Sequence, residues 1–196
     1  MPRPKQRTPE LRDRVLQVAI STLNADGLSG FTTRRVAEQA GTSVPAVYEL
    51  FGDKSGLLRA VFFEGFRMLA RQLLAVPETD DAVADVQRLI PEFRRFCLDY
   101  PALARVMFSR PFQHFDPGPE ALAMSPSVRE IFVRRIKRCT DAGLLTGDPL
   151  DIAHVLLALA QGLAVQEGGR WLGKSKASVN RRWEVAVTGL LRGFAR

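Results

Sequence analysis

Cysteine and histidine are scarce in this 196-residue sequence, and their scarcity argues against whole classes of protein. The two cysteines, Cys97 and Cys139, lie far apart without metal-ligand spacing. We therefore expect buried thiols in a reducing compartment, with redox sensing as the alternative. Two histidines allow no carboxylate–histidine cluster, and no recognised glycine-rich phosphate loop is present. The sequence predicts no enzyme activity, no metal and no cofactor.

Long apolar runs and strand signals are also lacking. No segment approaches the ~20 consecutive apolar residues that span a bilayer. The basic N-terminus, MPRPKQRTPE, is not followed by the apolar stretch of a signal peptide. Alternating β-branched segments and Asn-Gly hairpin turns are lacking, whereas helical periodicity runs through the chain. These absences predict an all-α, cytoplasmic protein without a membrane partner.

Positive charge, in contrast, is in excess. The sequence has 28 Lys and Arg against 21 Asp and Glu, which gives a formal net charge of +7 and a pI of about 10.1. Such a balance suits a polyanionic partner. An arginine-rich surface that only interacts with solvent explains the composition equally well until a motif distinguishes the two.

Start and stop signals of helices divide the chain. Thr8 and Pro9 open the first helix and Gly27 ends it, while Asp53 caps a long fourth helix and Pro91 is expected to kink or split the fifth. The expected helices are 8–26, 33–40, 43–51, 54–76, 80–99, 101–109, 125–143, 148–171 and 175–195, with a loop at 113–123. We divide them into an N-terminal domain, 1–53, and a C-terminal domain, 54–196.

Residues 33–51, TRRVAEQAGTSVPAVYELF, have the pattern of two helices joined by a tight turn. Ala37 must be small where the second helix crosses it, and Gly41 must adopt a left-handed conformation. The residues that must be apolar to hold the crossing angle are Val36, Ala40, Val44, Val47 and Phe51. The segment therefore predicts a helix-turn-helix, against the alternative of an ordinary helical hairpin.

The surrounding segment resembles the N-terminal domain of the tetracycline-repressor (TetR) family. The resemblance covers 15–62, VLQVAISTLNADGLSGFTTRRVAEQAGTSVPAVYELFGDKSGLLRAVF. The residues that carry it are Gly27, Thr32, Thr33, Val36, Ala37, Ala40, Gly41, Ser43, Val47, Tyr48, Phe51, Lys54, Leu57 and Leu58. It implies a three-helix DNA-binding head followed by a helical body for ligand binding and dimerisation.

The resemblance assigns DNA contacts to the head. Thr33, Arg34 and Lys54 are expected to hold phosphates, and Tyr48 is expected to lay its hydroxyl on the DNA backbone. The residues expected to face the major groove are Thr42, Ser43, Pro45, Ala46 and Glu49.

Two alternatives remain open in the head. Glu49 is either a specificity element or a side chain that points aside. The basic segment with Arg3, Lys5 and Arg7 either enters the minor groove or attracts DNA only generally.

Aromatic and apolar residues recur at helical spacing in the body. As a set they are expected to surround a small apolar or aromatic effector, although such a stripe taken residue by residue is usually plain core. The predicted ligand-binding residues are Phe62, Phe66, Leu69, Phe93, Phe96, Cys97, Met107, Phe108, Phe112 and Gln161. Further polar candidates are Gln113, His114 and Gln166; His114 is expected to be exposed and His154 to lie at an interface or in the core.

The helix expected at 148–171 is apolar nearly all round, and the one expected at 175–195 carries an apolar stripe, which together predict a four-helix interface between two copies. The predicted dimer residues are Val155, Leu159, Gly162, Trp183, Val187, Leu191 and Phe194.

Together these features predict a homodimeric repressor of a palindromic double-stranded DNA operator, released by a small apolar or aromatic effector. The alternative is a helix-turn-helix DNA-binding protein without such an effector, regulated by protein contacts.

Overall fold

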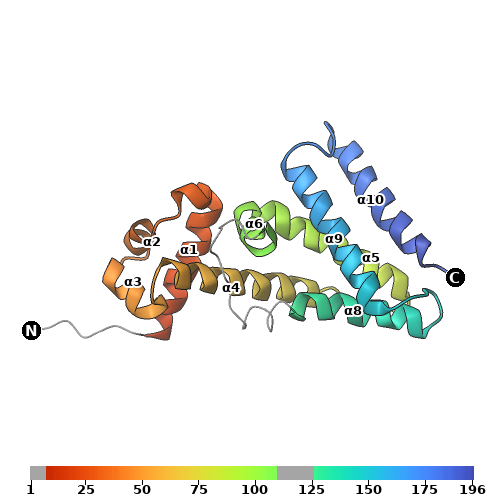
Figure 1. The fold of residues 1–196 in the computed structure, drawn as a ribbon, viewed down its shortest axis with the longest axis horizontal. Coiled ribbons are helices and arrows are strands. Elements are labelled where there is room, and N and C mark those ends of the chain that lie inside the picture. Colours follow the sequence, from red (N-terminus) through yellow and green to blue (C-terminus); the bar gives the residue numbers. More distant parts are fainter. Residues whose placement is uncertain (1–7, 110–125) are drawn as a thin grey trace, which may run out of the picture. The chain divides into compact units, whose positions relative to one another are not determined.

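The computed structural model describes residues 8–109 and 126–196, and these are almost entirely helical (Figure 1). The helices are α1 Pro9–Gly30, α2 Thr33–Gln39, α3 Val44–Phe51, α4 Lys54–Leu74, α5 Ala82–Asp99, α6 Pro101–Ser109, α8 Pro126–Asp141, α9 Pro149–Gly168 and α10 Lys176–Gly193. Within the described ranges the β structure is one isolated bridge, between Leu145 and Ala195. The predicted all-α class is confirmed.

The chain forms two compact units. In described residues, the first unit comprises 8–65 and 100–109, and the second comprises 66–99 and 126–196. The helix α4 contributes its first half to one unit and its second half to the other. The predicted division into domains at residue 53 stays a prediction.

Several predicted features fall outside the described residues. They are Arg3, Lys5, Arg7, Phe112, Gln113, His114, the loop 113–123 and the first residue of the helix expected at 125–143.

Side-chain caps begin the first three helices, and the sequence predicts the first of them. The hydroxyl of Thr8 accepts a hydrogen bond from the Leu11 amide (3.2 Å), and Pro9 occupies the first turn. The hydroxyl of Thr32 caps α2 by accepting a hydrogen bond from the amide of Arg35 (3.2 Å). The predicted end at Gly27 is a kink, since its φ of 66° leaves the helical region, and helical backbone resumes up to Gly30.

The core of the first unit includes one stripe of α1 and the inner faces of α2 and α3. The buried residues of these three helices include Leu11, Val15, Ala19, Leu23, Val36, Ala37 and Val47, and Ala40 and Phe31 are buried beside them. α1 packs against α2 and also against α6, which comes from the far side of α5 in the sequence.

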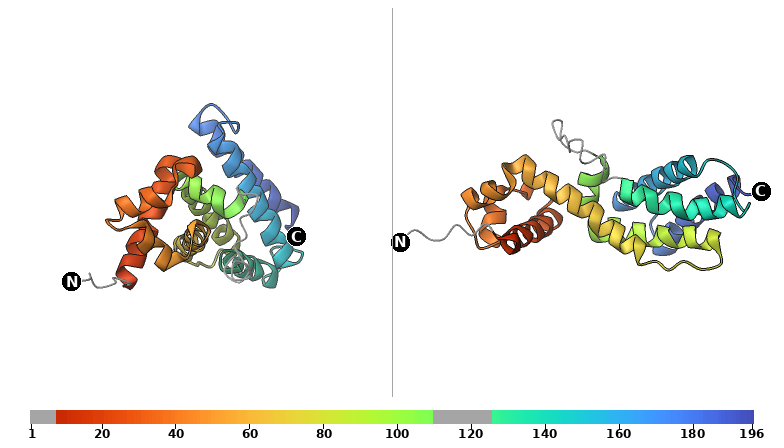
Figure 2. Two further views of the ribbon diagram at one scale, coloured as in Figure 1. Left: turned by 60° about the vertical axis from the view of Figure 1, so that its left-hand side comes forward. Right: turned by 90° about the horizontal axis from the view of Figure 1, so that it is seen from below.

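The second unit is a bundle in which α8 packs on α5 and α9, and α10 lies along α9 (Figure 2). α5 passes through Pro91 as a single helix, so the predicted split does not occur. Pro91 itself is exposed, whereas Ile90 and Phe93 on either side of it are buried, so both halves of α5 are held on one core.

Two networks of charged residues fasten the second unit. The carboxylate of Asp85, which has no exposed surface, accepts hydrogen bonds from Thr79, Arg88 and Arg138. The buried Arg135 donates to the carbonyl of Pro77 (3.1 Å) and so ties α8 to the segment between α4 and α5.

The other network joins α5, α9 and α10. Arg94 forms two hydrogen bonds of 2.7 Å to Glu167, whose carboxylate also accepts from the indole of Trp183 (2.8 Å). Burial would raise the pKa of Glu167, but the hydrogen bonds from Arg94 and Trp183 outweigh it and lower that pKa.

Candidate nucleic-acid interface

The turn between α2 and α3 has the geometry that the sequence predicts. Gly41 has a φ of 66°, and the amide of Thr42 donates to the carbonyl of Ala37 (2.9 Å). Ala37 is buried at the crossing. The hydroxyl of Ser43 then caps α3 by accepting from the amide of Ala46 (3.3 Å). The predicted helix-turn-helix is therefore present in residues 33–51.

Polar contacts fix this pair of helices to α1. The hydroxyl of Thr22 on α1 donates to Gln39 at the end of α2 (2.6 Å). The guanidinium of Arg12 lies 5.0 Å from the ring centroid of Phe51, the last residue of α3. Because these contacts act at the ends of α2 and α3, they restrain the orientation of α3.

The connection from α3 to α4 depends on glycine. A Cβ atom on Gly56 would lie 1.8 Å from the carbonyl oxygen of Phe51, a distance that no side chain allows. The amide of Gly56 donates to Asp53 (2.7 Å), which confirms Asp53 as the cap of α4. Lys54, one residue later, is exposed at the start of that helix.

The outer face of α3 is open to solvent. Pro45, Tyr48 and Glu49 are exposed on it, and Ala46 is half-buried. In the preceding turn, Ser43 is exposed and Thr42 half-buried. Because the capping bond uses one lone pair of the Ser43 hydroxyl, its proton and its second lone pair can serve outside partners.

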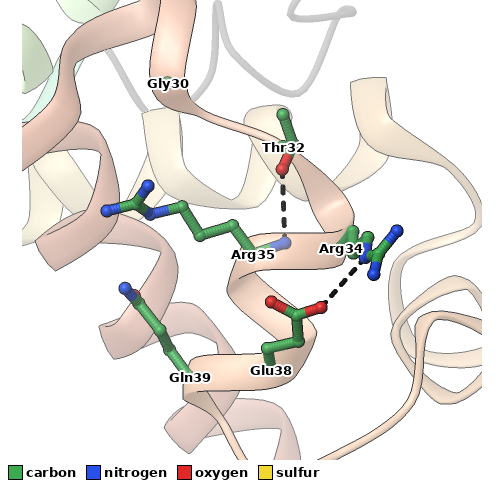
Figure 3. Close-up of a pocket in the computed structure, with 6 residues that line it drawn as sticks. All are labelled: Gly30, Thr32, Arg34, Arg35, Glu38 and Gln39. Atoms are coloured by element: carbon green, nitrogen blue, oxygen red, sulfur yellow. Dashed lines mark hydrogen bonds and ion pairs between the residues drawn. The ribbon is translucent and has the colours of Figure 1, made fainter.

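A shallow depression of about 430 Å³ lies beside α2, lined by Gly30, Thr32, Arg34, Arg35, Glu38 and Gln39 (Figure 3). Its two arginines have different neighbours. Arg34 forms one hydrogen-bonded ion pair with Glu38, at 2.9 Å. Arg35 forms two contacts with Asp26 on α1, at 2.9 and 3.1 Å.

Sequence reasoning placed Arg34 here but missed Glu38 and the Arg35–Asp26 pair. The spacing of four residues between Arg34 and Glu38 on a helix was a usable signal. No such signal exists for Arg35 and Asp26, because the chain between them passes through the kink at Gly27 and the turn after it. Thr33, also predicted to contact phosphate, is buried, so its side chain has little surface for DNA.

Most of the predicted ligand-binding residues that the structure describes are buried, as both a pocket and a plain core require. Seven are buried, Phe62, Phe66, Leu69, Phe93, Phe96, Cys97 and Met107, while Phe108 and Gln161 are half-buried. Burial raises the pKa of the Cys97 thiol to about 12, so this group stays protonated and is a poor nucleophile. The ligand assignment stays a prediction.

The predicted dimer residues divide into two groups. Val155 and Gly162 on α9 are exposed, and Leu159 and Phe194 are half-buried. The remaining three, Trp183, Val187 and Leu191, are buried within the chain's own second unit. The apolar stripe of α10 on which they lie packs inside the chain and leaves them almost no exposed area, and their assignment to a dimer surface stays a prediction.

Among residues 8–109 and 126–196, no group of three or more His, Cys, Asp and Glu side chains could hold a metal ion. One helix of this part of the chain, α9, is long and apolar enough to cross a membrane by length and composition alone. The core helix of a soluble protein passes the same test, so this is weak evidence.

Here α1 braces the helix-turn-helix, the outer face of α3 is exposed, and basic residues lie at the flanks of the motif. This arrangement defines a class of DNA-binding proteins. Residues 15–61 match the family described as "Bacterial regulatory proteins, tetR family", and residues 86–190 match "Tetracyclin repressor-like, C-terminal domain". The chain belongs to the TetR family of transcriptional regulators. Members of this family are DNA-binding regulators rather than enzymes. The predictions of a DNA-binding regulator and of no enzyme activity are therefore confirmed.

Individual relatives agree with this assignment. The tetracycline repressor protein class C of Escherichia coli is 31% identical over 156 residues, which cover 76% of this chain and 61% of the relative. The class A repressor from transposon 1721, also of Escherichia coli, is 38% identical over 163 residues, 78% of this chain and 65% of the relative. The chain thus spans less than two thirds of the length of these curated relatives.

A solved structure has the same fold over the whole chain. A protein of unknown function from Rhodococcus sp. RHA1 is 27% identical, with 100% of both chains covered and a TM-score of 0.83. A TetR transcription regulator from Haloarcula marismortui, 18% identical with a TM-score of 0.75, covers 96% of this chain and 100% of its own, and shows the fold alone.

Proposed function

We propose that this regulator is a repressor that binds a palindromic DNA operator as a homodimer and leaves it when a small apolar or aromatic effector binds. The observation that carries the proposal is the exposed outer face of α3 on a helix-turn-helix whose inner face is buried and braced. Acting on DNA, the protein works in the cytoplasm.

The head offers both kinds of DNA contact. Arg34, Tyr48 and Lys54 are exposed and can reach backbone phosphates, which supplies affinity without sequence preference. Ser43 and Ala46 lie at the start of α3, where recognition helices contact base edges. The net charge of +7 favours association with a polyanion.

The surface of α9 supports the homodimer. Val155 and Val165 on this helix are 46% and 62% exposed. Only 28% of the most apolar 18-residue stretch of α9 is buried within the chain. Between them, a Cβ atom on Gly162 would meet nothing within 4 Å, so another helix can approach closely there. A second copy of the chain, related by a two-fold axis, would cover this face and present two heads to two half-sites.

The effector is supported by the apolar composition around α5. Phe93 and Phe96 on α5 and Leu69 on α4 lie in the second unit without exposed surface. Because α4 runs from Lys54 to Leu74 and belongs to both units, a shift in its later turns can be passed along one helix to the DNA-binding end.

A regulator without a small-molecule effector is the second candidate function. The complete burial of Phe93 and Phe96 is compatible with it, because a plain packed core also covers these side chains. A ligand screen by thermal denaturation distinguishes the two, since a bound effector raises the midpoint and lowers operator affinity.

Selection of bound fragments from random duplex DNA tests the proposal directly. We expect recovered sites to be palindromic, with half-sites about 10–10.5 bp apart or a small multiple of that spacing. Asymmetric sites, or an absence of enrichment, would contradict the operator proposal.

A further inference from the structure

The two arginines beside the depression in the head have different tasks. Arg35 is held by two contacts to Asp26, and the side chains are 50% and 25% exposed. The Asp26 side chain in turn packs against Gly30, where a Cβ atom would lie 2.5 Å from the Asp26 Cβ. Arg35 thus joins α2 to α1 and is committed to the fold.

Arg34 is committed much less. Its side chain is 84% exposed and its printed partner, Glu38, is 63% exposed on the same helix. Ion pairs with this exposure stabilise a protein weakly. The order of the pair, with the cation on the N-terminal side, is also the less favourable one for residues four apart on a helix. A stronger anion can therefore displace Glu38 at little cost to the fold.

A DNA phosphate has the same requirements as the Glu38 carboxylate. Both are anions with at least two oxygens that accept hydrogen bonds from a guanidinium. In the geometry seen here the Nε of Arg34 donates to Glu38 at 2.9 Å, so the Nε edge of the guanidinium is not open to a phosphate for a pair of parallel hydrogen bonds (Figure 3). A phosphate that takes this edge would leave the carboxylate unpaired and close to a second negative charge.

We propose that Glu38 competes with the DNA backbone for Arg34 and thereby weakens the sequence-independent part of DNA binding. This inference rests on the proposed function, in which the head binds DNA and Arg34 contacts a phosphate. Glu38 is a positioning residue: it touches no base and acts by holding the guanidinium of Arg34. As a result of this competition, the total affinity for DNA depends more on the contacts made by α3.

The test uses the full-length protein and a short fluorescent duplex of random sequence, titrated by anisotropy at several salt concentrations. Glu38→Gln should bind about two- to fivefold more tightly than the wild type. The slope of log affinity against log salt should become steeper by up to about 0.9, because one more cation is available for phosphate.

A double-mutant cycle separates this mechanism from simple charge repulsion. In an Arg34→Gln background, Glu38→Gln should change affinity by much less than it does in the wild type. Glu130→Gln, an exposed site on α8, makes the same change in net charge and should leave the affinity unchanged. Circular dichroism and thermal melts check that each variant is folded.

An equal gain from Glu38→Gln with and without Arg34 would overturn the inference, as would no gain at all. In either case a wild type that binds duplex DNA leaves the proposed function standing. A folded wild type that does not bind duplex DNA at any salt concentration would overturn the proposed function, and this inference with it.

Discussion

The sulfur of Met107 lies 2.6 Å from the position that a Cβ atom on Gly65 would occupy. Leu103, one turn earlier on α6, lies 3.0 Å from the same position. All three residues belong to the first compact unit, so α6 packs directly on the backbone of α4 there. Glycine at 65 is therefore a requirement of helix packing, and its φ plays no part in it.

Replacing this glycine should loosen the contact between α4 and α6. Gly65→Val places a branched side chain where Met107 and Leu103 already lie, and overpacking of this kind costs about 1–3 kcal/mol of unfolding free energy. Chemical denaturation measures the difference. Gly189→Val on α10, where a Cβ atom would meet nothing within 4 Å, is the matched control and should change stability by no more than about 0.5 kcal/mol.

A second substitution identifies the clashing side chain. If the Met107 sulfur causes the cost, Met107→Ala should make Gly65→Val nearly neutral when the two are combined. Additive effects of the two changes would show that the strain lies elsewhere.

Acid should destabilise the second unit through Asp85. Burial would raise the pKa of this carboxyl, but hydrogen bonds from the Thr79 amide, Arg138, the Thr79 hydroxyl and Arg88 outweigh it and hold the pKa well below its usual range. The stabilisation is complete above the pKa of the unfolded chain, about 3.9. It is lost as pH falls below that value and through the lower pKa of the folded state.

Thermal melts from neutral to strongly acid pH measure this dependence. Asp85→Asn should lower the melting temperature at pH 7 and flatten its fall below about pH 4. Asp141→Asn, which removes an exposed carboxylate paired with Lys137, should change the curve little. An acid limb that is as steep in Asp85→Asn as in the wild type would show that another group titrates.

Disruption of the exposed face of α9 should dissociate the dimer. Introducing charge by Val155→Glu and Val165→Glu places two carboxylates in the surface that a second copy is proposed to cover. Sedimentation at micromolar concentration should show twice 21.8 kDa for the wild type and a monomer for the variant. Leu98→Glu, on an exposed position of α5, is the control and should stay dimeric. A monomeric wild type would contradict the homodimer.

Backbone and base contacts should respond differently to substitution. Lys54→Ala should weaken binding to all sequences and reduce the salt slope by about one. Ala46→Thr should change base preference, because Ala46 lies in the first turn of α3. Selection on random duplexes and salt titration separate the two effects. A change of base preference in Lys54→Ala at unchanged affinity would refute its assignment to phosphate.

The head was predictable from the sequence because its signals are local. The caps Thr8 and Asp53, with glycine at Gly41, specify where helices begin and turn. The C-terminal end of α9 was less predictable. The helix ends at Gly168, before the predicted Trp171, because Gly169 caps it and Arg170 adopts a φ of 61°. That positive φ in a residue other than glycine has no signal in the sequence.

The periodicity of apolar residues does not show which helix or chain packs against an apolar stripe. Trp183, Val187 and Leu191 repeat at helical spacing and were expected to meet a second copy, but they are buried inside their own chain. Periodicity identifies the buried face of a helix and says nothing of which chain covers it. The Arg34–Glu38 pair, in contrast, follows from spacing alone, whereas Arg35–Asp26 needs the tertiary structure.

Overpacking the predicted effector site should imitate the effector. Leu69 on α4 has no exposed surface, so Leu69→Trp forces its neighbours apart at a cost of about 1–3 kcal/mol. If α4 transmits this strain to its DNA-binding end, operator affinity should fall while sedimentation still shows a dimer. A fall of 100-fold corresponds to about 2.7 kcal/mol of difference between the two states.

The control for Leu69→Trp must disrupt the core equally but lie on another helix, far from α4 in the sequence. Leu156→Trp on α9 meets this requirement, since Leu156 is also fully buried in the second unit and lies outside the predicted ligand set. Leu69→Trp should weaken operator binding more than Leu156→Trp does, at matched thermal stability. Equal losses in the two variants would mean that destabilisation alone weakens binding, and α4 would then have no special part in release.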